Sequence, residues 1–226
     1  MDTPKTTTLD WNKQYRIIPS EYPAINFFEN LVEPELMDEL YYIESLTNER
    51  LRDEIGDISL VPIHDRISGP GTSPIMAAFT HTSPDCPSRF SNGSYGVYYA
   101  ANNLKTAIAE TKHHRARFLA YTCEDAGEID MRVYIGEVVK PMHDIRDEKY
   151  QTLLNPDDWQ VSQTFGQQMK TDNAWGIVYP SVRNPGGECI AALRPPAIST
   201  PRQGAHLSYV WNGQIITKVY EKRLIG

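Results

Sequence analysis

The chain has 226 residues, of which 40% are hydrophobic and 23% are charged, and its net charge is −7. This hydrophobic share is enough for a folded globular core, and the length suits one large domain or a domain with an extension. The acidic balance argues against direct, non-specific binding of nucleic acid, which requires a basic face. An anionic ligand could still bind where arginines cluster locally.

Cysteine usage and the absence of long apolar runs predict a cytoplasmic protein. Cys86, Cys123 and Cys189 lie far apart and form no CxxC pair, which argues against a structural zinc site. An odd number of cysteines in an acidic chain suits a reducing compartment. The first residues contain no apolar signal core, and no stretch approaches the roughly 20 apolar residues that span a bilayer. An effector exported without a cleaved signal would have the same features.

The N-terminal quarter predicts a helical extension. Residues 1–20 are polar, and we expect them to be irregular. Residues 24–55 have apolar positions at helical spacing, and Glu33 and Pro34 suit the first turn of a helix. We therefore expect two helices here, in an extension over residues 1–56 that leans on a main domain over residues 57–226 and regulates it rather than contributing to catalysis.

A region rich in glycine and proline follows. Residues 60–63 predict a short strand, and residues 64–88 predict a long loop that is interrupted by the apolar run 75–79. Loops of this length inside compact domains are often functional.

The stretch from Arg89 to Glu110, RFSNGSYGVYYAANNLKTAIAE, combines a loop, a strand and the start of a helix. The strand is expected at residues 97–99, and Asn102 or Asn103 can cap a helix that ends near residue 119. Arg89 then precedes the strand, Tyr99 ends it, and Glu110 lies two turns into the helix. An arginine, a phenol and a carboxylate could meet at one pocket, which suits a phosphate-bearing aromatic ligand with a developing positive charge.

The remaining segments mix strands and helices without a regular βαβ rhythm. We expect strands at 128–139, 175–179 and 189–193 and a helix at 156–170. Asn212-Gly213 between two β-rich runs predicts a type I′ hairpin. The fold class is therefore α+β with a mixed, mostly antiparallel sheet.

Each candidate site residue also has an ordinary structural interpretation. Glu110 could be a solvated carboxylate, Arg89 a surface arginine, Tyr99 a core residue and Ser181 a turn serine. His113 and His114 are adjacent, so on a helix they diverge by about 100° and do not easily share a metal ion; we expect surface positions, with one facing the pocket, and no metal site.

Other enzyme classes find little support. The phosphate-binding patterns GxGxxG and GxxxxGK[ST] and the hydrolase pattern GxSxG are absent. A serine hydrolase would need Ser181, an acid and a histidine, and nothing in the sequence places His64, His81 or His143 beside Ser181.

Four stretches together resemble a known family. HDRISGPGTSPIMAAFTH, RFSNGSYGVYYA, NNLKTAIAETKHHRARF and WGIVYPSVRNPGGECI, within residues 64–190, resemble the RES domain, the toxin half of bacterial RES–Xre toxin–antitoxin pairs. The family repeats the arginine at Arg89, the strand tyrosine at Tyr99 and the helix that carries Glu110 in this order. Ser181 matches the family serine, and Arg66 matches an arginine near the start of the family domain.

The resemblance implies a fold similar to ADP-ribosyltransferase toxins and an enzyme that cleaves the nicotinamide–ribose bond of NAD, which is consumed as substrate with no further cofactor. Water, phosphate or a protein side chain could be the acceptor, giving a glycohydrolase, a phosphorylase or an ADP-ribosyltransferase. The implied partner is an Xre-like antitoxin with a helix-turn-helix segment, and a homo-oligomer is compatible with the sequence. A non-catalytic nucleotide- or antitoxin-binding module is the alternative from another class.

The chemistry of the residues agrees with these implied roles. Cleavage of the glycosidic bond develops oxocarbenium character, which the carboxylate of Glu110 would stabilise. Arginine forks at Arg89 and Arg66 suit the diphosphate, and the ring of Tyr99 can stack on nicotinamide. We therefore predict Glu110, Arg89 and Ser181 as catalytic residues and Arg66, Arg89, Tyr99 and Ser181 as NAD-binding residues.

Overall fold

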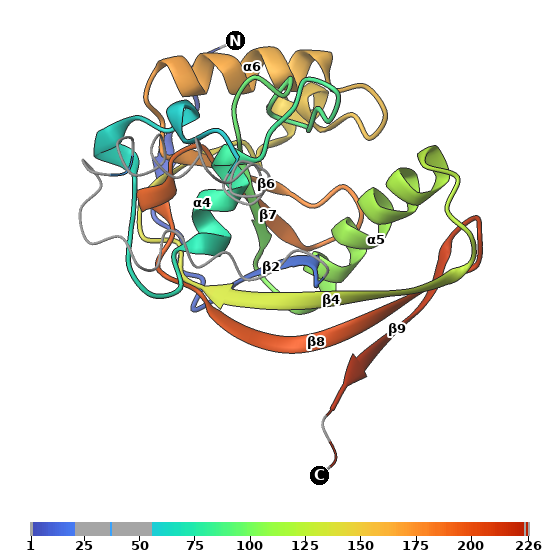
Figure 1. Ribbon diagram of the computed structural model, residues 1–226. Helices are drawn as coiled ribbons and strands as arrows, with labels where there is room; N and C mark the ends of the chain where they lie inside the picture. The colour runs from blue at the N-terminus through green and yellow to red at the C-terminus, as the bar shows by residue number, and fades with distance from the viewer. Residues whose placement is uncertain (1, 21–36, 38–55, 224, 226) are drawn as a thin grey trace.

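The computed structural model describes residues 2–20, 37, 56–223 and 225. Within this part of the chain, nine strands form one sheet in the order β1-β5-β6-β7-β3-β2-β4-β8-β9 (Figure 1). Neighbouring strands are antiparallel except for β5 and β6, which are parallel. The predicted α+β class with a mixed, mostly antiparallel sheet is confirmed. The strands are β1 (Thr6–Thr7), β2 (Gln14–Pro19), β3 (Tyr98–Ala101), β4 (Gly127–Gly136), β5 (Met142–Asp144), β6 (Gly176–Pro180), β7 (Glu188–Ala192), β8 (Arg202–Trp211) and β9 (Ile216–Lys222).

Three α-helices of the described residues pack around this sheet: α4 (Ser73–Thr80), α5 (Leu104–Tyr121) and α6 (Gln160–Thr171). Asn103 caps α5, because its side chain accepts a hydrogen bond from the backbone N–H of Thr106 at 2.9 Å. This confirms the predicted start of the helix. Short 3₁₀-helices connect the elements: η2 (Ile58–Leu60), η3 (Ile63–Asp65), η4 (Glu148–Leu154) and η5 (Pro195–Ala197).

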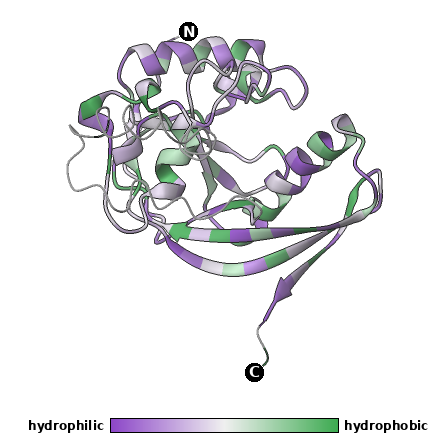
Figure 2. Cartoon of the chain, viewed as in Figure 1, coloured by the Kyte–Doolittle hydropathy of each residue, from purple (hydrophilic) through white to green (hydrophobic). Residues whose placement is uncertain are grey.

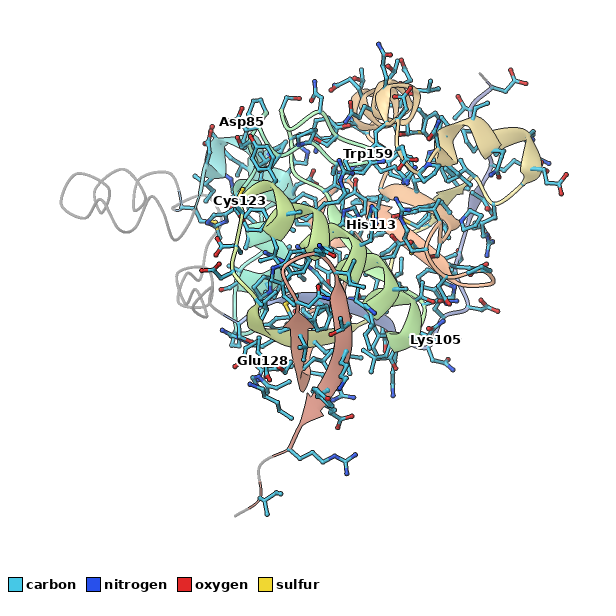
Figure 3. The ribbon with its side chains drawn as sticks, turned by 90° about the vertical axis from the view of Figure 1, so that its right-hand side faces the viewer. Asp85, Lys105, His113, Cys123, Glu128 and Trp159 are labelled. Carbon is cyan, nitrogen blue, oxygen red and sulfur yellow. The ribbon has the colours of Figure 1, made fainter. Side chains whose placement is uncertain are left out.

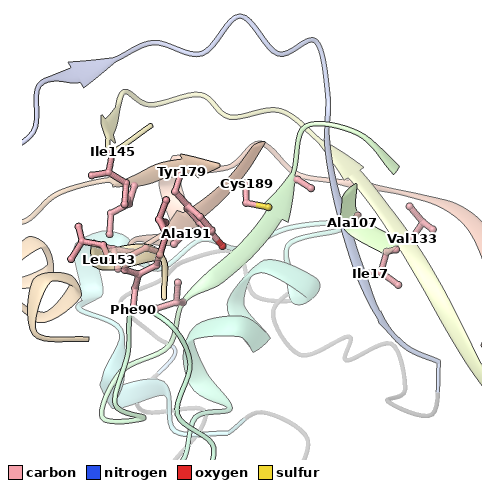
Figure 4. Close-up of a cluster of buried hydrophobic side chains, with 14 of the residues drawn as sticks. Ile17, Phe90, Ala107, Val133, Ile145, Leu153, Tyr179, Cys189 and Ala191 are labelled. Atoms are coloured by element: carbon pink, nitrogen blue, oxygen red, sulfur yellow. The ribbon is translucent and has the colours of Figure 1, made fainter. Parts of the chain in front are cut away.

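Alternation along the central strands produces a core on each face of the sheet. Tyr179, Cys189 and Ala191 point to one face, where Phe90 and residues of α5, α6 and η4 cover them (Figure 4). The intervening residues of the same strands point to the opposite face, which α4, η2 and η5 cover. Hydrophobic and hydrophilic residues are likewise interleaved along β4 and β8 (Figure 2). The period of two is the pattern expected of strands with two distinct faces.

The expectation that residues 1–20 are irregular was wrong. β2 lies inside the sheet, and all six of its residues pair with β4, including Ile17 opposite Val133. β1 forms one edge of the sheet, where it pairs with β5. The apolar signal of β2 is only Ile17 and Ile18 within a polar segment, so tertiary pairing rather than local pattern determines this strand. Both strands precede the boundary predicted at residue 56.

Residues 58–80 also differ from expectation. The strand predicted at residues 60–63 is wrong, because 3₁₀ turns occupy residues 58–60 and 63–65. Asp57 caps the first turn, since its carboxylate accepts from the backbone N–H of Ser59 at 2.9 Å. The apolar run at 75–79 within the predicted loop is helix α4, with Pro74 in its first turn.

The C-terminal elements follow the prediction with shifted ends. α6 begins at Gln160 rather than near Pro156, because the side chain of Asn155 accepts from the backbone N–H groups of Asp157 and Asp158 and forms a turn first. The predicted hairpin is confirmed as β8–β9, but its type I′ turn is wrong. Trp211 pairs with Ile216, and of residues 212–215 only Gly213 has positive φ, whereas type I′ requires two such residues.

The two helices predicted for residues 24–55 lie outside the described residues, apart from Met37, which is buried in the core on the α4 face of the sheet. No described helix is both long enough and apolar enough to cross a membrane.

The segment that leads into β3 (Tyr98–Ala101) approaches α4 closely at Gly96. A Cβ at this position would lie 2.2 Å from the Cα of Phe79 and 2.4 Å from the carbonyl oxygen of Ala78, both of which are backbone atoms. We expect Gly96→Ala to lower the free energy of unfolding by about 1–3 kcal/mol or more, because α4 must move away from the segment at residue 96. Gly127→Ala is the control, since a Cβ there meets only one atom, at 4.0 Å. Urea denaturation of both variants measures the difference, and equal unfolding free energies would contradict it.

Candidate active site

A pocket opens where two central strands separate. β2 pairs with β3 only at Tyr15 opposite Ala101, although it pairs with β4 along its full length. At the next residue, Nη1 of Arg16 donates to the carbonyl oxygen of Tyr99 at 3.1 Å in place of a backbone hydrogen bond. A pocket of about 340 Å³ lies along this separation, with walls from β2, β3, β7 and α5. Its lining includes Arg16, Ser88, Arg89, Tyr99, Glu110, His114, Arg115, Tyr179 and Cys189.

Glu110 lines this pocket and is fixed by Ser181. Ser181 Oγ donates to Glu110 Oε1 at 2.6 Å, and the same Oγ accepts from the backbone N–H groups of Arg183 and Asn184 at 3.2 Å and 3.0 Å. The two backbone donors occupy the lone pairs of the hydroxyl, so its proton is directed to the carboxylate. Ser181 does not itself line the pocket. Ser181 therefore orients the Glu110 side chain from outside the pocket.

The loop that carries Ser181 is attached to the first turn of α5. Nδ2 of Asn184 donates to Thr106 Oγ1 at 2.8 Å, and Gly187 approaches the same threonine so closely that a Cβ would lie 2.3 Å from Oγ1. Ser181 and Gly187 also close the loop through a backbone hydrogen bond of 2.8 Å. These contacts hold Glu110 and Ser181 at a fixed separation although they are 71 residues apart in the chain.

Cys189 contacts the same carboxylate oxygen. Its Sγ lies 3.9 Å from Glu110 Oε1, and burial together with the carboxylate charge raises the pKa of the thiol well above its usual range. Cys189 is therefore a protonated weak donor rather than a thiolate nucleophile. Both donors act on Oε1, and no described residue forms a hydrogen bond to Oε2. That oxygen is the one available to a ligand.

The phenol of Tyr99 is already engaged. Its hydroxyl accepts from the backbone N–H of Phe90 at 3.0 Å and shares a hydrogen bond of 2.9 Å with Ser88 Oγ. Burial raises the pKa of this phenol, so it remains protonated. The hydroxyl therefore fixes the loop at residues 88–90, while the ring contributes to the pocket wall.

Arg89 is buried and partly engaged in the structure of the protein. Its Nη1 donates to the carbonyl oxygens of Leu153 and Asn155 at 3.3 Å and 2.8 Å. The guanidinium also lies 6.0 Å from the ring of Trp159. Since Arg89 lines the pocket as well, it supplies positive charge there from a fixed position.

Two further arginines, Arg16 and Arg115, line the pocket, and the sequence did not single them out. No described acidic residue forms a salt bridge with Arg16, Arg89 or Arg115. Burial lowers the pKa of Arg16, whose guanidinium lies 4.5 Å from the ring of Tyr98. The sequence signal for Arg16 is its place between the β-forming residues Tyr15 and Ile17, in a segment whose polar composition favours irregular structure.

Of the adjacent histidines, His114 lines the pocket and His113 does not, as expected. His113 and Trp159 lie on the same side of the molecule (Figure 3), and the ring of His114 lies 6.0 Å from that of Trp159. Partial burial, followed by the positive charge of Arg183, lowers the pKa of His113. Among the described residues no group of three or more His, Cys, Asp or Glu could hold a metal ion.

The structure does not bring Arg66 into the pocket. Its Nε donates to the carbonyl oxygen of Val61 at 2.9 Å and its Nη2 to that of Ile58 at 3.4 Å, so its guanidinium holds the 3₁₀ turn η2 on the α4 face of the sheet. The hydrolase alternative also lacks its geometry, because no described histidine forms a hydrogen bond with Ser181 Oγ.

Comparison with known proteins gives the family. A model of the RES domain matches residues 64–212, which is more than half of the chain. Uncharacterized protein y4oC of Sinorhizobium fredii (strain NBRC 101917 / NGR234) is 31% identical over 208 residues, covering 91% of this chain and 86% of that protein. A chain in the crystal structure of the M. tuberculosis MbcT–MbcA toxin–antitoxin complex matches with 13% identity and a TM-score of 0.44, over 93% of this chain and 87% of that one. The chain belongs to the RES domain family.

We expect Tyr99→Phe to lower the free energy of unfolding by about 1–3 kcal/mol, because the buried backbone N–H of Phe90 loses its acceptor. Tyr121→Phe is the matched control, since Tyr121 is 88% exposed. Chemical denaturation measures both variants. If both unfold like the parent protein, the hydroxyl of Tyr99 does not hold the loop and is free for a ligand.

Proposed function

We propose that this RES-domain protein cleaves the nicotinamide–ribose bond of NAD and acts as the toxin of a toxin–antitoxin pair. The observation that carries the proposal is the carboxylate of Glu110, which lines the pocket while Ser181 holds its other side at 2.6 Å. Family membership supports the toxin role. The corresponding partner is an Xre-like antitoxin, and the proposed compartment is the cytoplasm.

Glu110 is suited to the charge that this reaction develops. Breaking the bond between C1′ of the ribose and the nicotinamide nitrogen returns the electron pair to the pyridine ring and leaves an oxocarbenium-like ribose. A carboxylate oriented before the reaction stabilises that charge more in the transition state than in the bound substrate. Ser181 and Cys189 both act on Oε1, which leaves Oε2 for the ribose.

The pocket also suits the anionic part of the substrate. The chain carries a net charge of −7, but Arg16, Arg89 and Arg115 line the pocket without acidic partners among the described residues. Guanidinium groups match phosphate oxygens in both charge and geometry. We assign Arg16 and Arg115 to direct contacts with the diphosphate. Arg89 contributes positive charge to the pocket without such a contact, because its Nη1 already donates to two carbonyl groups.

The positions of the other assigned residues refine their roles. Tyr99 offers its ring as a stacking surface, since its hydroxyl is engaged within the loop. Ser181 acts as a positioning residue through Glu110. Water and phosphate both remain as acceptors, giving a glycohydrolase or a phosphorylase.

We expect Glu110→Gln to retain the fold and to lose about 10²-fold to 10³-fold of the rate of nicotinamide release, because the amide still accepts from Ser181 but carries no charge. Glu124→Gln is the matched control, an exposed residue just after α5 and outside the pocket.

The assay mixes pure protein with NAD and identifies every product by mass spectrometry. ADP-ribose indicates water as the acceptor, ADP-ribose carrying an added phosphate indicates phosphate, and a mass gain on a protein indicates ADP-ribosylation. A folded Glu110→Gln variant with the parental rate would refute the role of Glu110, and a parent protein that releases no nicotinamide would refute the proposed activity.

We expect Arg16→Met to weaken binding of ADP-ribose by about 10-fold to 100-fold, the loss of one charge-assisted interaction. Arg16→Lys should be intermediate, because it keeps the charge without the fork. Arg202→Met, at an exposed arginine of β8 that does not line the pocket, is the control. Titration calorimetry gives the dissociation constants, and unchanged affinity in a folded Arg16→Met variant would remove Arg16 from the site.

A further inference from the structure

A second cavity adjoins the Glu110 pocket. Its volume is about 520 Å³, and helix α4 and the loop at residues 82–97 form most of its walls. We call it the α4 cavity. The two cavities share six lining residues: Arg16, Ile18, Pro19, Ser88, Tyr99 and Arg115. Shared walls mean that a single elongated ligand can occupy both, and each volume is in the range of small-molecule sites.

The wall formed by α4 consists of small side chains. Pro74, Ala77 and Ala78 face this cavity and are half-buried, while Ile75, Met76 and Phe79 of the same helix are buried in the core. These buried side chains hold the helix rigidly against the core. Its cavity face has no side chain long enough to fill the space. Such a surface accepts a flat ring system. Polar groups at His81, Thr82 and Ser83 lie along the same cavity.

Positive charge is concentrated at the junction of the cavities. Arg16 and Arg115 line both of them, and neither forms a salt bridge with a described residue. A ligand that spans the junction therefore passes two guanidinium groups between its two ends. Anionic linkers such as a diphosphate match this arrangement, with one ring on each side.

We propose that the α4 cavity binds the adenosine half of a pyridine dinucleotide, with the diphosphate at Arg16 and Arg115 and the nicotinamide riboside half at Glu110. This inference rests on the proposed function and adds the element that determines specificity. Contacts remote from the reacting bond contribute to catalysis when they hold the substrate in place, so a substrate without the adenosine half loses that contribution. The protein should select dinucleotides over nicotinamide mononucleotide.

The test compares the full-length parent with Ala77→Phe, which fills the α4 cavity from its helical wall, and with Ala77→Leu, a smaller change that should have a smaller effect. Ala120→Phe is the matched control, an exposed alanine of α5 that lines neither cavity. Kinetics of nicotinamide release are measured with NAD and with nicotinamide mononucleotide. Binding of ADP, which carries the adenosine half and both phosphates, is measured by calorimetry, and circular dichroism checks the fold.

We expect the parent to prefer NAD, with a higher kcat/KM for NAD than for the mononucleotide. In Ala77→Phe this preference should fall by about tenfold or more through a higher KM for NAD, with little change in the kinetics of the mononucleotide. ADP affinity should fall in parallel, and Ala120→Phe should behave as the parent. A folded Ala77→Phe variant with unchanged preference and unchanged ADP affinity would overturn the inference, as would a parent that binds no ADP. If the parent releases nicotinamide from neither substrate, the proposed function fails, and ADP binding still decides whether the α4 cavity is an adenosine site.

Discussion

The hydrogen bond from Ser181 to Glu110 is the interaction on which the arrangement of the site depends. It connects α5 to the loop between β6 and β7, although the two bonded residues are 71 residues apart in the sequence. A glutamate side chain on a helix can adopt several rotamers, and restricting it to one of them costs conformational entropy. Here that cost is met by the folded loop, because Ser181 is itself held by two backbone N–H groups. The side chain of Glu110 is therefore oriented before any ligand arrives, which is the condition for efficient electrostatic stabilisation.

The separation of β2 from β3 provides the space that this carboxylate faces. A central sheet normally closes such a gap with a continuous ladder of hydrogen bonds, and unpaired backbone groups in the interior are costly. The protein offsets this cost with a side chain, because Arg16 supplies the donor for the carbonyl oxygen of Tyr99. The same guanidinium lines both cavities. One residue thus satisfies the backbone where the sheet opens and contributes positive charge to the opening.

The sequence allowed the prediction of local elements with strong signals but not of the contacts that assemble the site. The capped helix α5 and the strand before it follow from Asn103, apolar spacing and β-forming residues, so Arg89, Tyr99 and Glu110 could be placed in one pocket. β2 and Arg16 were missed because a strand buried between two others needs little local signal of its own. The resemblance groups Arg66 with the site, yet its guanidinium holds the 3₁₀ turn η2 on the other face of the sheet. The role of Ser181 behind Glu110 depends on a long-range contact that no spacing rule reveals.

The distribution of charge determines how such a pocket can attract an anion. At physiological ionic strength the Debye length is about 8 Å, so the net charge of −7 gives no long-range attraction to an anionic dinucleotide, and its repulsion is felt only close to the surface. Affinity must therefore come from short-range donors inside the pocket, where Arg16, Arg89 and Arg115 lack acidic partners among the described residues. Such contacts act mainly on the dissociation rate, because they form only after the ligand has entered. The acidic surface and the basic pocket together favour a ligand that presents its phosphates in the correct geometry over polyanions that only carry charge.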